Sequence, residues 1–270
     1  MAMEAASARD GHPTRPGIER AALSDLGCQR PNNEDRYSYW EPADEEQFKR
    51  KGRLALVADG MGGYEGGQEA SRIAIEAIEK VYAESAGDPR ASLIAGFQAA
   101  HQQIGEYATA HPDLAGMGTT CTGIALLGRD LYYAHVGDSR LYLAHGTNLH
   151  RLTRDHSYVG RLVEQGIISP EEATSHPQRH ILTAALGAGP ELSPESPEEA
   201  ISLEPGDMLV LCSDGLWSQV SDDEIRSALA ANNLEAVCHS LVQTAKDHGG
   251  PDNITIQILR VMDGQQSNGS

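Results

Sequence analysis

Positive charge is scarce in this sequence, in which 39 acidic residues stand against 21 lysines and arginines and give a formal net charge of −18. Nucleic acids and anionic membrane surfaces attract proteins through basic patches, so this balance argues against both kinds of partner. It is compatible with a cation-binding site, because divalent ions offset the repulsion between clustered carboxylates.

Cysteine is also rare, and long hydrophobic runs are missing. The four cysteines include no Cys-x-x-Cys pair, which argues against a zinc or redox motif and favours a reducing compartment. No apolar run approaches the roughly 20 residues of a transmembrane helix. Residues 1–16 lack the apolar segment of a signal peptide. We therefore expect a cytoplasmic monomer without membrane insertion.

The motifs of several other enzyme classes are absent. No cysteine is followed six positions later by arginine, so the cysteine-phosphatase loop is missing. The sequence contains no Gly-x-x-x-x-Gly-Lys loop, no His-Glu-x-x-His and no Gly-x-Ser-x-Gly elbow. The segment Gly60-Met61-Gly62 fails the dinucleotide fingerprint, because Glu65 stands where the third glycine belongs.

Acidic residues recur at the ends of apolar segments that are typical of buried strands. Asp59 follows the run 54–58 and precedes glycines, and Asp214 and Asp138 follow two similar runs. Asp252 stands just before another apolar strand segment. Four carboxylates delivered by distant strand ends predict one site for a hard cation, since such ions prefer oxygen ligands.

The segment between residues 24 and 37 combines turn residues with three charged side chains, Arg30, Glu34 and Asp35. One interpretation is a charged surface turn. The other gives Arg30 a phosphate-binding role, because a guanidinium meets a phosphate through two parallel hydrogen bonds. Glu34 and Asp35 would then add oxygen ligands near the cations. The segment alone does not decide between them.

Hydrophobic periodicity predicts strands alternating with amphipathic helices. Capping boxes at Ser169 and Ser221 begin two helices, and the polar residues 41–52 are expected to form a loop. The strands between residues 119 and 152 are joined by short turns and predict an antiparallel meander. Strands are predicted at 18–24, 36–40, 54–59, 119–127, 130–136, 139–144, 149–152, 207–212 and 254–261, and helices at 68–85, 89–109, 158–165, 222–231 and 234–246.

We expect one domain over residues 17–262, because no linker or internal repeat divides this stretch. A disordered leader over residues 1–16 and a disordered tail over residues 263–270 would flank it. Residues 158–186 predict a small helical flap beside the site.

Taken in order, these motifs resemble those of the metal-dependent protein phosphatases of type 2C, and the resemblance covers residues 18–262. The length of the chain and Met61, which follows Asp-Gly, resemble bacterial members. The motifs are Arg30 with Asn33-Glu34-Asp35, Ala58-Asp59-Gly60-Met61-Gly62-Gly63, Gly118-Thr119-Thr120, Val136-Gly137-Asp138-Ser139-Arg140, Leu152-Thr153-Arg154-Asp155-His156-Ser157, Cys212-Ser213-Asp214-Gly215 and Asp252-Asn253.

The resemblance implies an α+β fold, a four-layer αββα sandwich with two central antiparallel sheets flanked by helices. It also implies two Mg²⁺ or Mn²⁺ ions, with room for a third, all held by oxygen. Asp59 would bridge the two ions, and the Gly60 carbonyl would bind one of them. The remaining ligands would be Asp214 and Asp252 for the first ion, Glu34 directly or with Asp35 through water for the second, and Asp138 with Asp214 for the third.

The implied activity is hydrolysis of phosphoserine and phosphothreonine by a hydroxide that bridges two metal ions, with Arg30 holding the phosphoryl group. The partners would be phosphorylated proteins, in a system with a cognate serine/threonine kinase. Many eukaryotic relatives have histidine where this chain has Met61, so the proton donor is left unnamed, with His156 as a weak candidate. The alternatives are a two-metal phosphoesterase acting on small phosphates and a non-catalytic, phosphoprotein-binding pseudophosphatase.

Overall fold

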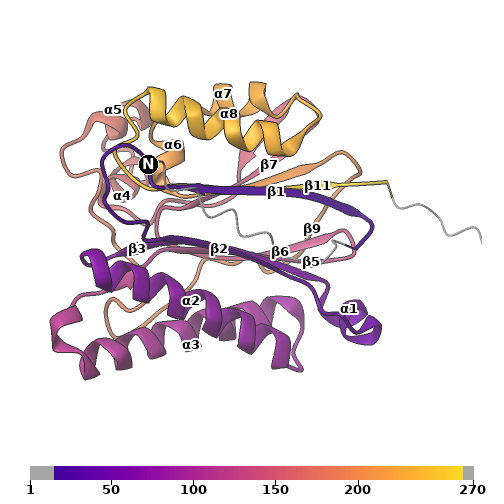
Figure 1. Ribbon diagram of the computed structural model, residues 1–270, viewed down its shortest axis with the longest axis horizontal. Helices are drawn as coiled ribbons and strands as arrows, with labels where there is room; N and C mark the ends of the chain where they lie inside the picture. The colour runs from indigo at the N-terminus through magenta and orange to yellow at the C-terminus, as the bar shows by residue number, and fades with distance from the viewer. Residues whose placement is uncertain (1–14, 264–270) are drawn as a thin grey trace, which may run out of the picture.

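Two antiparallel sheets lie face to face in the computed structural model, which describes residues 15–263, and helices cover both outer faces (Figure 1). The expected four-layer α+β sandwich is confirmed. The first sheet has the order β1 (Ile18–Asp25), β11 (Ile254–Val261), β10 (Met208–Cys212), β7 (Arg140–His145) and β8 (Asn148–Arg151). The second has the order β2 (Asp35–Trp40), β3 (Arg53–Met61), β5 (Cys121–Leu127), β6 (Asp130–Val136) and β9 (Ile201–Ser202), with β4 (Gly118–Thr119) paired to the end of β3.

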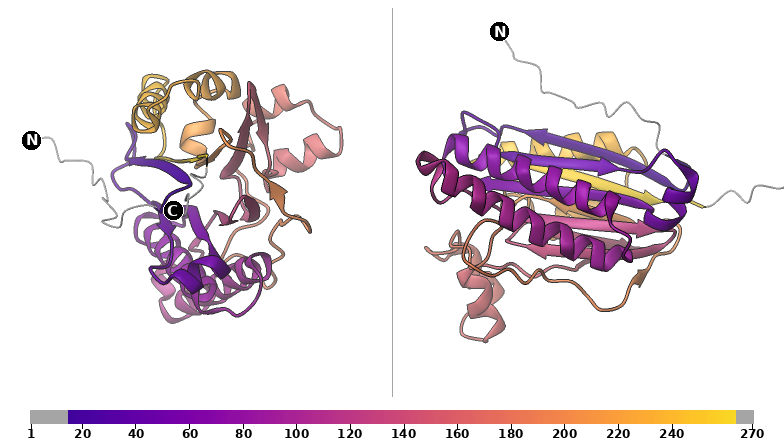
Figure 2. Two further views of the ribbon diagram at one scale, coloured as in Figure 1. Left: turned by 90° about the vertical axis from the view of Figure 1, so that its right-hand side faces the viewer. Right: turned by 90° about the horizontal axis from the view of Figure 1, so that it is seen from below.

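The helices lie outside the sheets, as Figures 1 and 2 show. Helices α2 (Tyr64–Glu84) and α3 (Pro89–Ala110) cover the second sheet, and α7 (Asp222–Ala228) and α8 (Leu234–Asp247) cover the first. None of the helices within residues 15–263 is both long and apolar enough to cross a membrane. The short helices are α1 (Glu45–Lys51), η1 (Pro112–Leu114), α4 (Tyr158–Glu164), α5 (Pro170–Ser175) and α6 (Asp214–Trp217).

Three apolar layers hold the sandwich together, one between the sheets and one under each helical cover. Strand β3 shows why a central strand of this sandwich has an uninterrupted apolar run. Leu54, Leu56 and Ala58 face the helices, whereas Ala55 and Val57 face the other sheet, and all five are buried. Side chains alternate between the faces of a strand, so a strand covered on both faces must be apolar at every position.

Three local predictions were wrong: those for α1, for the start of α2 and for the strand meander. The segment expected to be a loop contains α1, which Asp44 caps by accepting a hydrogen bond from the Gln47 N–H. Helix α2 begins at Tyr64 rather than Gln68, because Gly66 and Gly67 pack within it against Met117 and Glu34.

The predicted meander is wrong at one connection, although β5 pairs with β6 and β7 with β8 as expected. Strand β6 belongs to the second sheet and β7 to the first, so the chain crosses between the sheets at Gly137. The backbone of Gly137 has φ +107°, and a Cβ there would lie 2.5 Å from Thr120 Cβ. Glycine is therefore needed at this crossing.

The segment expected to form a flap contains α4 and α5, which stand apart from the sandwich in Figure 2. The capping boxes at Ser169 and Ser221 are confirmed. Residues 1–14 of the expected leader and 264–270 of the expected tail lie outside the described residues. Arg15, which was expected to belong to the leader, contacts the body of the protein, where its backbone N–H donates to Glu41 over 2.8 Å.

Candidate metal centre

The predicted acidic residues come together at the end of the sandwich where β2 begins and β3 ends. Asp35 and Asp59 are paired neighbours in the register of these strands. Burial and the neighbouring charges of Asp35, Asp214, Asp138 and Asp252 raise the pKa of Asp59 well above its ordinary value. Asp59 therefore lies close to acids from four other segments of the chain.

Two threonines fix the backbone of Asp59. Its N–H donates to Thr120 Oγ1 over 3.1 Å. Its carbonyl accepts from the Thr119 hydroxyl over 2.8 Å and from the Thr120 N–H over 2.9 Å. Both threonines are buried, so the position of Asp59 follows from the pairing of β3 with the segment that enters β5.

Glu34 is set beside Asp59 by a close approach of three backbones. Gly60 donates its N–H to the Glu34 carbonyl over 3.3 Å, and a Cβ on Gly60 would lie only 2.8 Å from that oxygen. A Cβ on Gly67 of α2 would overlap Glu34 Oε2. Gly67 thus leaves the space that the Glu34 side chain occupies, and Gly60 allows the close approach of the Glu34 backbone.

Asn253 binds the loop that carries Glu34 to the first sheet. Its side-chain oxygen accepts from the Glu34 N–H over 2.8 Å, and its side-chain nitrogen donates to the carbonyls of Leu26 and Asn32. The neighbouring Asp252 accepts a hydrogen bond from Arg30 Nη2 over 2.6 Å. Arg30, whose side chain is 45% exposed, therefore stands at the mouth of the acidic cluster.

In the metal-free protein, burial and mutual repulsion raise the pKa values of the clustered carboxyl groups, so that they do not all ionise together readily. Burial raises the pKa of Asp35 to about 7, against the effect of hydrogen bonds from Ser213 and Thr255. Burial and the charge of Asp252 raise the pKa of Asp214 to about 6. Burial and the charge of Asp214 raise the pKa of Asp138 well above its ordinary range. Burial also raises the pKa of Glu34, which Arg30 opposes.

Two buried oxygens in this cluster have no hydrogen-bond partner, Asp35 Oδ1 and Asp214 Oδ1. A buried carboxylate oxygen without a donor is costly, and a hard cation satisfies such an oxygen. The donor set is carboxylate and carbonyl oxygen only, which fits Mg²⁺ or Mn²⁺ and does not fit zinc. The residues of the acidic cluster therefore fit the Mg²⁺ or Mn²⁺ ions that the sequence implied.

The acids are more widely spaced than the ligands of a single ion. Within the described residues, the one group of three His, Cys, Asp or Glu ligand atoms lying within 4.8 Å of one another is His135, His156 and Glu195. Asp59, Asp214 and Asp252 do not meet this limit as a group, so binding of one ion by all three would draw their carboxylates closer together.

The comparison with known protein families covers most of the same acidic residues. The family model described as "Protein phosphatase 2C" matches residues 32–249. The chain belongs to the protein phosphatase 2C family. This match includes Glu34, Asp35, Asp59, Asp138 and Asp214 and ends just before Asp252.

Individual members of the family are similar over most of this chain. Serine/threonine protein phosphatase PstP of Mycobacterium tuberculosis is 41% identical over 248 residues, which cover 91% of this chain and 45% of PstP. The chain thus spans less than half the length of that relative. Protein phosphatase PhpP of Streptococcus pneumoniae is 36% identical over 249 residues, with 90% and 97% of the two chains covered.

A crystal structure of the PstP catalytic domain in complex with two manganese ions has the same fold. It matches with a TM-score of 0.79 and 37% identity, and the match covers 92% of this chain and 99% of that one. The four-layer sandwich is therefore the fold of the 2C phosphatases.

The His135, His156 and Glu195 group is held by hydrogen bonds without a metal. Burial lowers the pKa of His135 to about 4, and its Nε2 lies 3.0 Å from the Arg154 carbonyl, which can only accept. The Gly137 N–H donates to His156 Nδ1 over 3.3 Å, and His156 Nε2 lies 3.7 Å from Glu195 Oε2. These contacts account for the position of the His156 ring without a metal.

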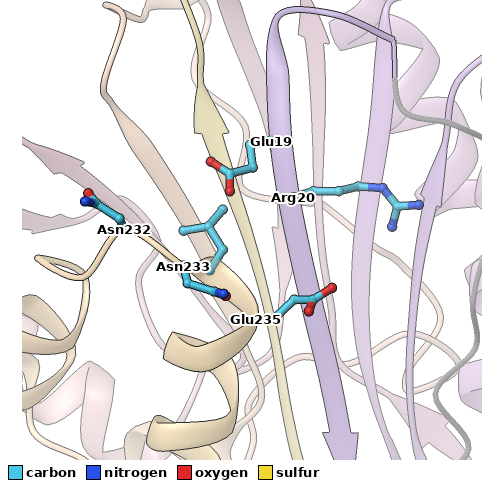
Figure 3. Close-up of a pocket in the computed structure, with 6 residues that line it drawn as sticks. Glu19, Arg20, Asn232, Asn233 and Glu235 are labelled. Carbon is cyan, nitrogen blue, oxygen red and sulfur yellow. The ribbon is translucent and has the colours of Figure 1, made fainter.

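A separate surface hollow lies between β1 and the start of α8 (Figure 3). None of the predicted site residues lines it, and its charged groups, Glu19, Arg20 and Glu235, are of mixed sign. The hollow is therefore no part of the acidic site of this 2C family member.

Sequence reasoning gave no role to several residues that support the acids. Ser213, Asn253, Thr120 and Gly67 were either unremarked or named only within motifs. Their roles depend on contacts between segments far apart in the chain, such as the bond from Ser213 to Asp35, and no local pattern encodes those contacts. Their place in motifs of the 2C family was the one available signal.

Proposed function

We propose that this chain is a metal-dependent serine/threonine phosphatase that hydrolyses phosphoserine and phosphothreonine in proteins. The observation that carries the proposal is a buried cluster of carboxylates with two oxygens that lack any partner, beside a half-exposed arginine. The names of the relatives PstP and PhpP support it, as do the two manganese ions bound by the PstP catalytic domain.

We assign the cation ligands to the acids that converge on Asp59. Asp59 would bridge two ions, with the Gly60 carbonyl and Asp214 and Asp252 completing one site, and with Glu34 and Asp35 completing the other. Asp138 and Asp214 would hold a third ion. Two bound Mg²⁺ or Mn²⁺ ions would supply a solvent nucleophile that is ionised near neutral pH. By holding the ions, the carboxylates would fix the side of the phosphorus atom from which in-line attack comes.

Arg30 would hold the phosphoryl oxygens. The hydrogen bond from Nη2 to Asp252 fixes one edge of the guanidinium, while the side chain stays 45% exposed and faces solvent at the mouth of the site. An arginine anchored in this way can give two parallel hydrogen bonds to a phosphate. Because Arg30 also touches a proposed metal ligand, it would orient the phosphorus relative to the cations.

The wider setting is proposed on the same basis. We infer a role opposite a serine/threonine kinase, with phosphorylated proteins as substrates, action in the cytoplasm as a monomer, and no nucleic-acid partner. The net charge of −18 supports the last point. Residues 17–262 would form the catalytic unit, with residues 158–186 as a flap.

The test is phosphate release from a phosphothreonine peptide, with Mn²⁺ and with excess chelator. We expect release with Mn²⁺ alone, and loss of at least ~100-fold of the rate in Asp214→Asn, since metal chemistry of this kind contributes several kcal/mol. Asp223→Asn, which changes an exposed acid at the start of α7, is the matched control and should keep full activity.

Other outcomes would replace the proposal. Turnover of small phosphate esters without any peptide turnover would favour a two-metal phosphoesterase. Binding of phosphopeptide without turnover of either substrate would favour a pseudophosphatase. Full activity in chelator would exclude the metal mechanism.

A further inference from the structure

Trp217 links the two acids that we assign to the third cation. It is the last residue of α6, a single helical turn that begins at Asp214. Its indole Nε1–H donates to the main-chain carbonyl of Asp138 over 2.8 Å. One side chain therefore ties the helix of Asp214 to the backbone of Asp138, although the two acids lie on segments 76 positions apart in the sequence.

The indole ring is itself held in place by a cation. The Arg140 guanidinium carbon lies 3.5 Å from the centroid of the Trp217 ring. Arg140 donates to both carboxylate oxygens of Asp155, over 3.0 and 2.7 Å, and to the Tyr142 hydroxyl over 3.1 Å. A planar guanidinium fixed at its edges is a rigid stacking surface, so the ring of Trp217 has one preferred position.

The residue before Asp138 is fastened from the other side. The Gly137 carbonyl accepts from the His156 N–H over 2.7 Å, and the Gly137 N–H donates to the His156 ring over 3.3 Å. The backbone at Asp138 is thus bonded on both sides, and its side chain is almost fully buried and close to the charge of Asp214. Of these contacts, the hydrogen bond from Trp217 is the one that links Asp138 directly to the helix that begins with Asp214.

We propose that Trp217 is a positioning residue that sets the spacing between the Asp138 and Asp214 carboxylates and thereby the affinity of the third cation position. The inference rests on the proposed function, because that function assigns cations to these acids. Trp217 is only partly buried, yet its N–H donates to the main chain of a proposed ligand rather than to solvent.

The test is Mn²⁺ binding to the full chain, measured from the free-ion electron paramagnetic resonance signal. Trp217→Phe keeps an aromatic ring and removes the donor. We expect the weakest class of bound Mn²⁺ to lose about tenfold in affinity, the scale of one hydrogen bond, while the tighter ions bind as before. In an Asp138→Asn background, where the position has already lost a ligand, Trp217→Phe should cost little more, because both changes act on the same position.

Trp40→Phe is the matched control. Trp40 ends β2 and packs edge-on against Tyr82, with ring centroids 6.0 Å apart, at the opposite end of the strand from Asp35. This variant should bind all ions as the wild type does. It also leaves Trp217 as the one tryptophan in the chain, so that paramagnetic quenching of its fluorescence reports an ion nearby.

The outcomes separate this inference from the proposed function. Wild-type binding isotherms in Trp217→Phe would overturn the role of Trp217 and leave the phosphatase proposal standing. If the wild type binds no Mn²⁺ and shows no Mn²⁺-dependent turnover, both fail. If Trp217→Phe does not fold, quenching in Trp40→Phe decides. If the weakest class of bound Mn²⁺ quenches Trp217 fluorescence, and this quenching disappears when Asp138→Asn is added to Trp40→Phe, the inference is supported. If the weakest class causes no such quenching, the inference is overturned.

Discussion

The hydroxyl of Ser213 donates a hydrogen bond over 2.7 Å to Asp35 Oδ2 and so joins the two sheets at the acidic site. Ser213 follows β10 of the first sheet, and Asp35 begins β2 of the second. The same hydroxyl accepts from the Thr255 N–H over 3.0 Å, so it is fixed within its own sheet. Asp35 thereby receives a donor on one carboxylate oxygen, while the other oxygen has no partner.

Replacing Ser213 by alanine should destabilise the metal-free protein by about 1–3 kcal/mol, because a buried carboxylate loses its donor. It should also raise the pKa of Asp35 further, since the bond from Ser213 lowers it. Urea unfolding in chelator measures the first effect. Ser38→Ala is the control, because Ser38 Oγ is buried in β2 without a partner and its removal should cost almost nothing. Equal losses in the two variants would contradict the role of Ser213.

Replacing Gly67 by alanine should weaken Mn²⁺ binding. A Cβ at this position of α2 would overlap the Glu34 carboxylate and the Gly60 backbone, so Glu34 must move away from the site. Gly105→Ala is the matched control in α3, where a Cβ would meet nothing within 4 Å. That change should stabilise the protein by about 0.5–1 kcal/mol, the usual gain of alanine over glycine in a helix. Calorimetric Mn²⁺ titration and urea unfolding distinguish the two variants, and unchanged Mn²⁺ affinity in Gly67→Ala would refute the prediction.

Replacing Arg30 by alanine should raise KM for a phosphothreonine peptide by about tenfold or more, because charge-assisted hydrogen bonds are worth about 1.5–3 kcal/mol. The Tm should change little, since a partly exposed ion pair contributes about 0–1 kcal/mol. Arg226→Ala breaks another surface pair with an aspartate, that with Asp223, and should change neither quantity. An increase in the Kd for Mn²⁺ as large as the increase in KM would remove the assigned role of Arg30.

The metal-free protein should lose stability as the pH rises. Burial raises the pKa of Asp35 from 3.8 to about 7 and that of Asp214 from 3.8 to about 6. A carboxyl whose pKa is higher in the folded state holds its proton more tightly there. Its contribution to stability is therefore full below the unfolded pKa and is lost as the pH passes the folded one. We expect Tm in chelator to fall between about pH 4 and about pH 7, the interval between the unfolded and the folded pKa values.

Two comparisons check the origin of this pH dependence. Asp35→Asn should flatten the fall, because the amide does not titrate. Saturating Mn²⁺ should abolish it, because the cations favour the ionised carboxylates. A pH profile of Asp35→Asn that superimposes on that of the wild type would assign the effect to other groups.

The sequence predicted the elements that bury an apolar face and missed those held by distant contacts. Helix α3 was predicted within one residue, because its apolar stripe is long and Asp88 caps it. Helix α1 was missed, since its one large apolar residue, Phe48, packs beneath the guanidinium groups of Arg15 and Arg53. No period within seven residues reveals such a contact.

The identity of the acids was predictable, because each stands at the end of a strand and belongs to a family motif. The contacts that hold these acids in place were not predictable from the sequence. The crossing at Gly137 looked like a hairpin turn, since a short glycine turn between two apolar strands usually joins neighbours in one sheet. The turn instead carries the chain from one sheet to the other, and Trp217 meets the carbonyl of Asp138 only because of that crossing.

The apolar layer between the sheets has a consequence for the evolution of the site. Val57 lies two residues before Asp59 in one sheet, and Leu211 lies three before Asp214 in the other, and both are fully buried in that layer. A shorter or longer side chain there would change the distance between the sheets and hence between acids that each sheet carries. Drift in residues that never meet a cation is therefore a route by which the metal requirement can diverge while every carboxylate is retained.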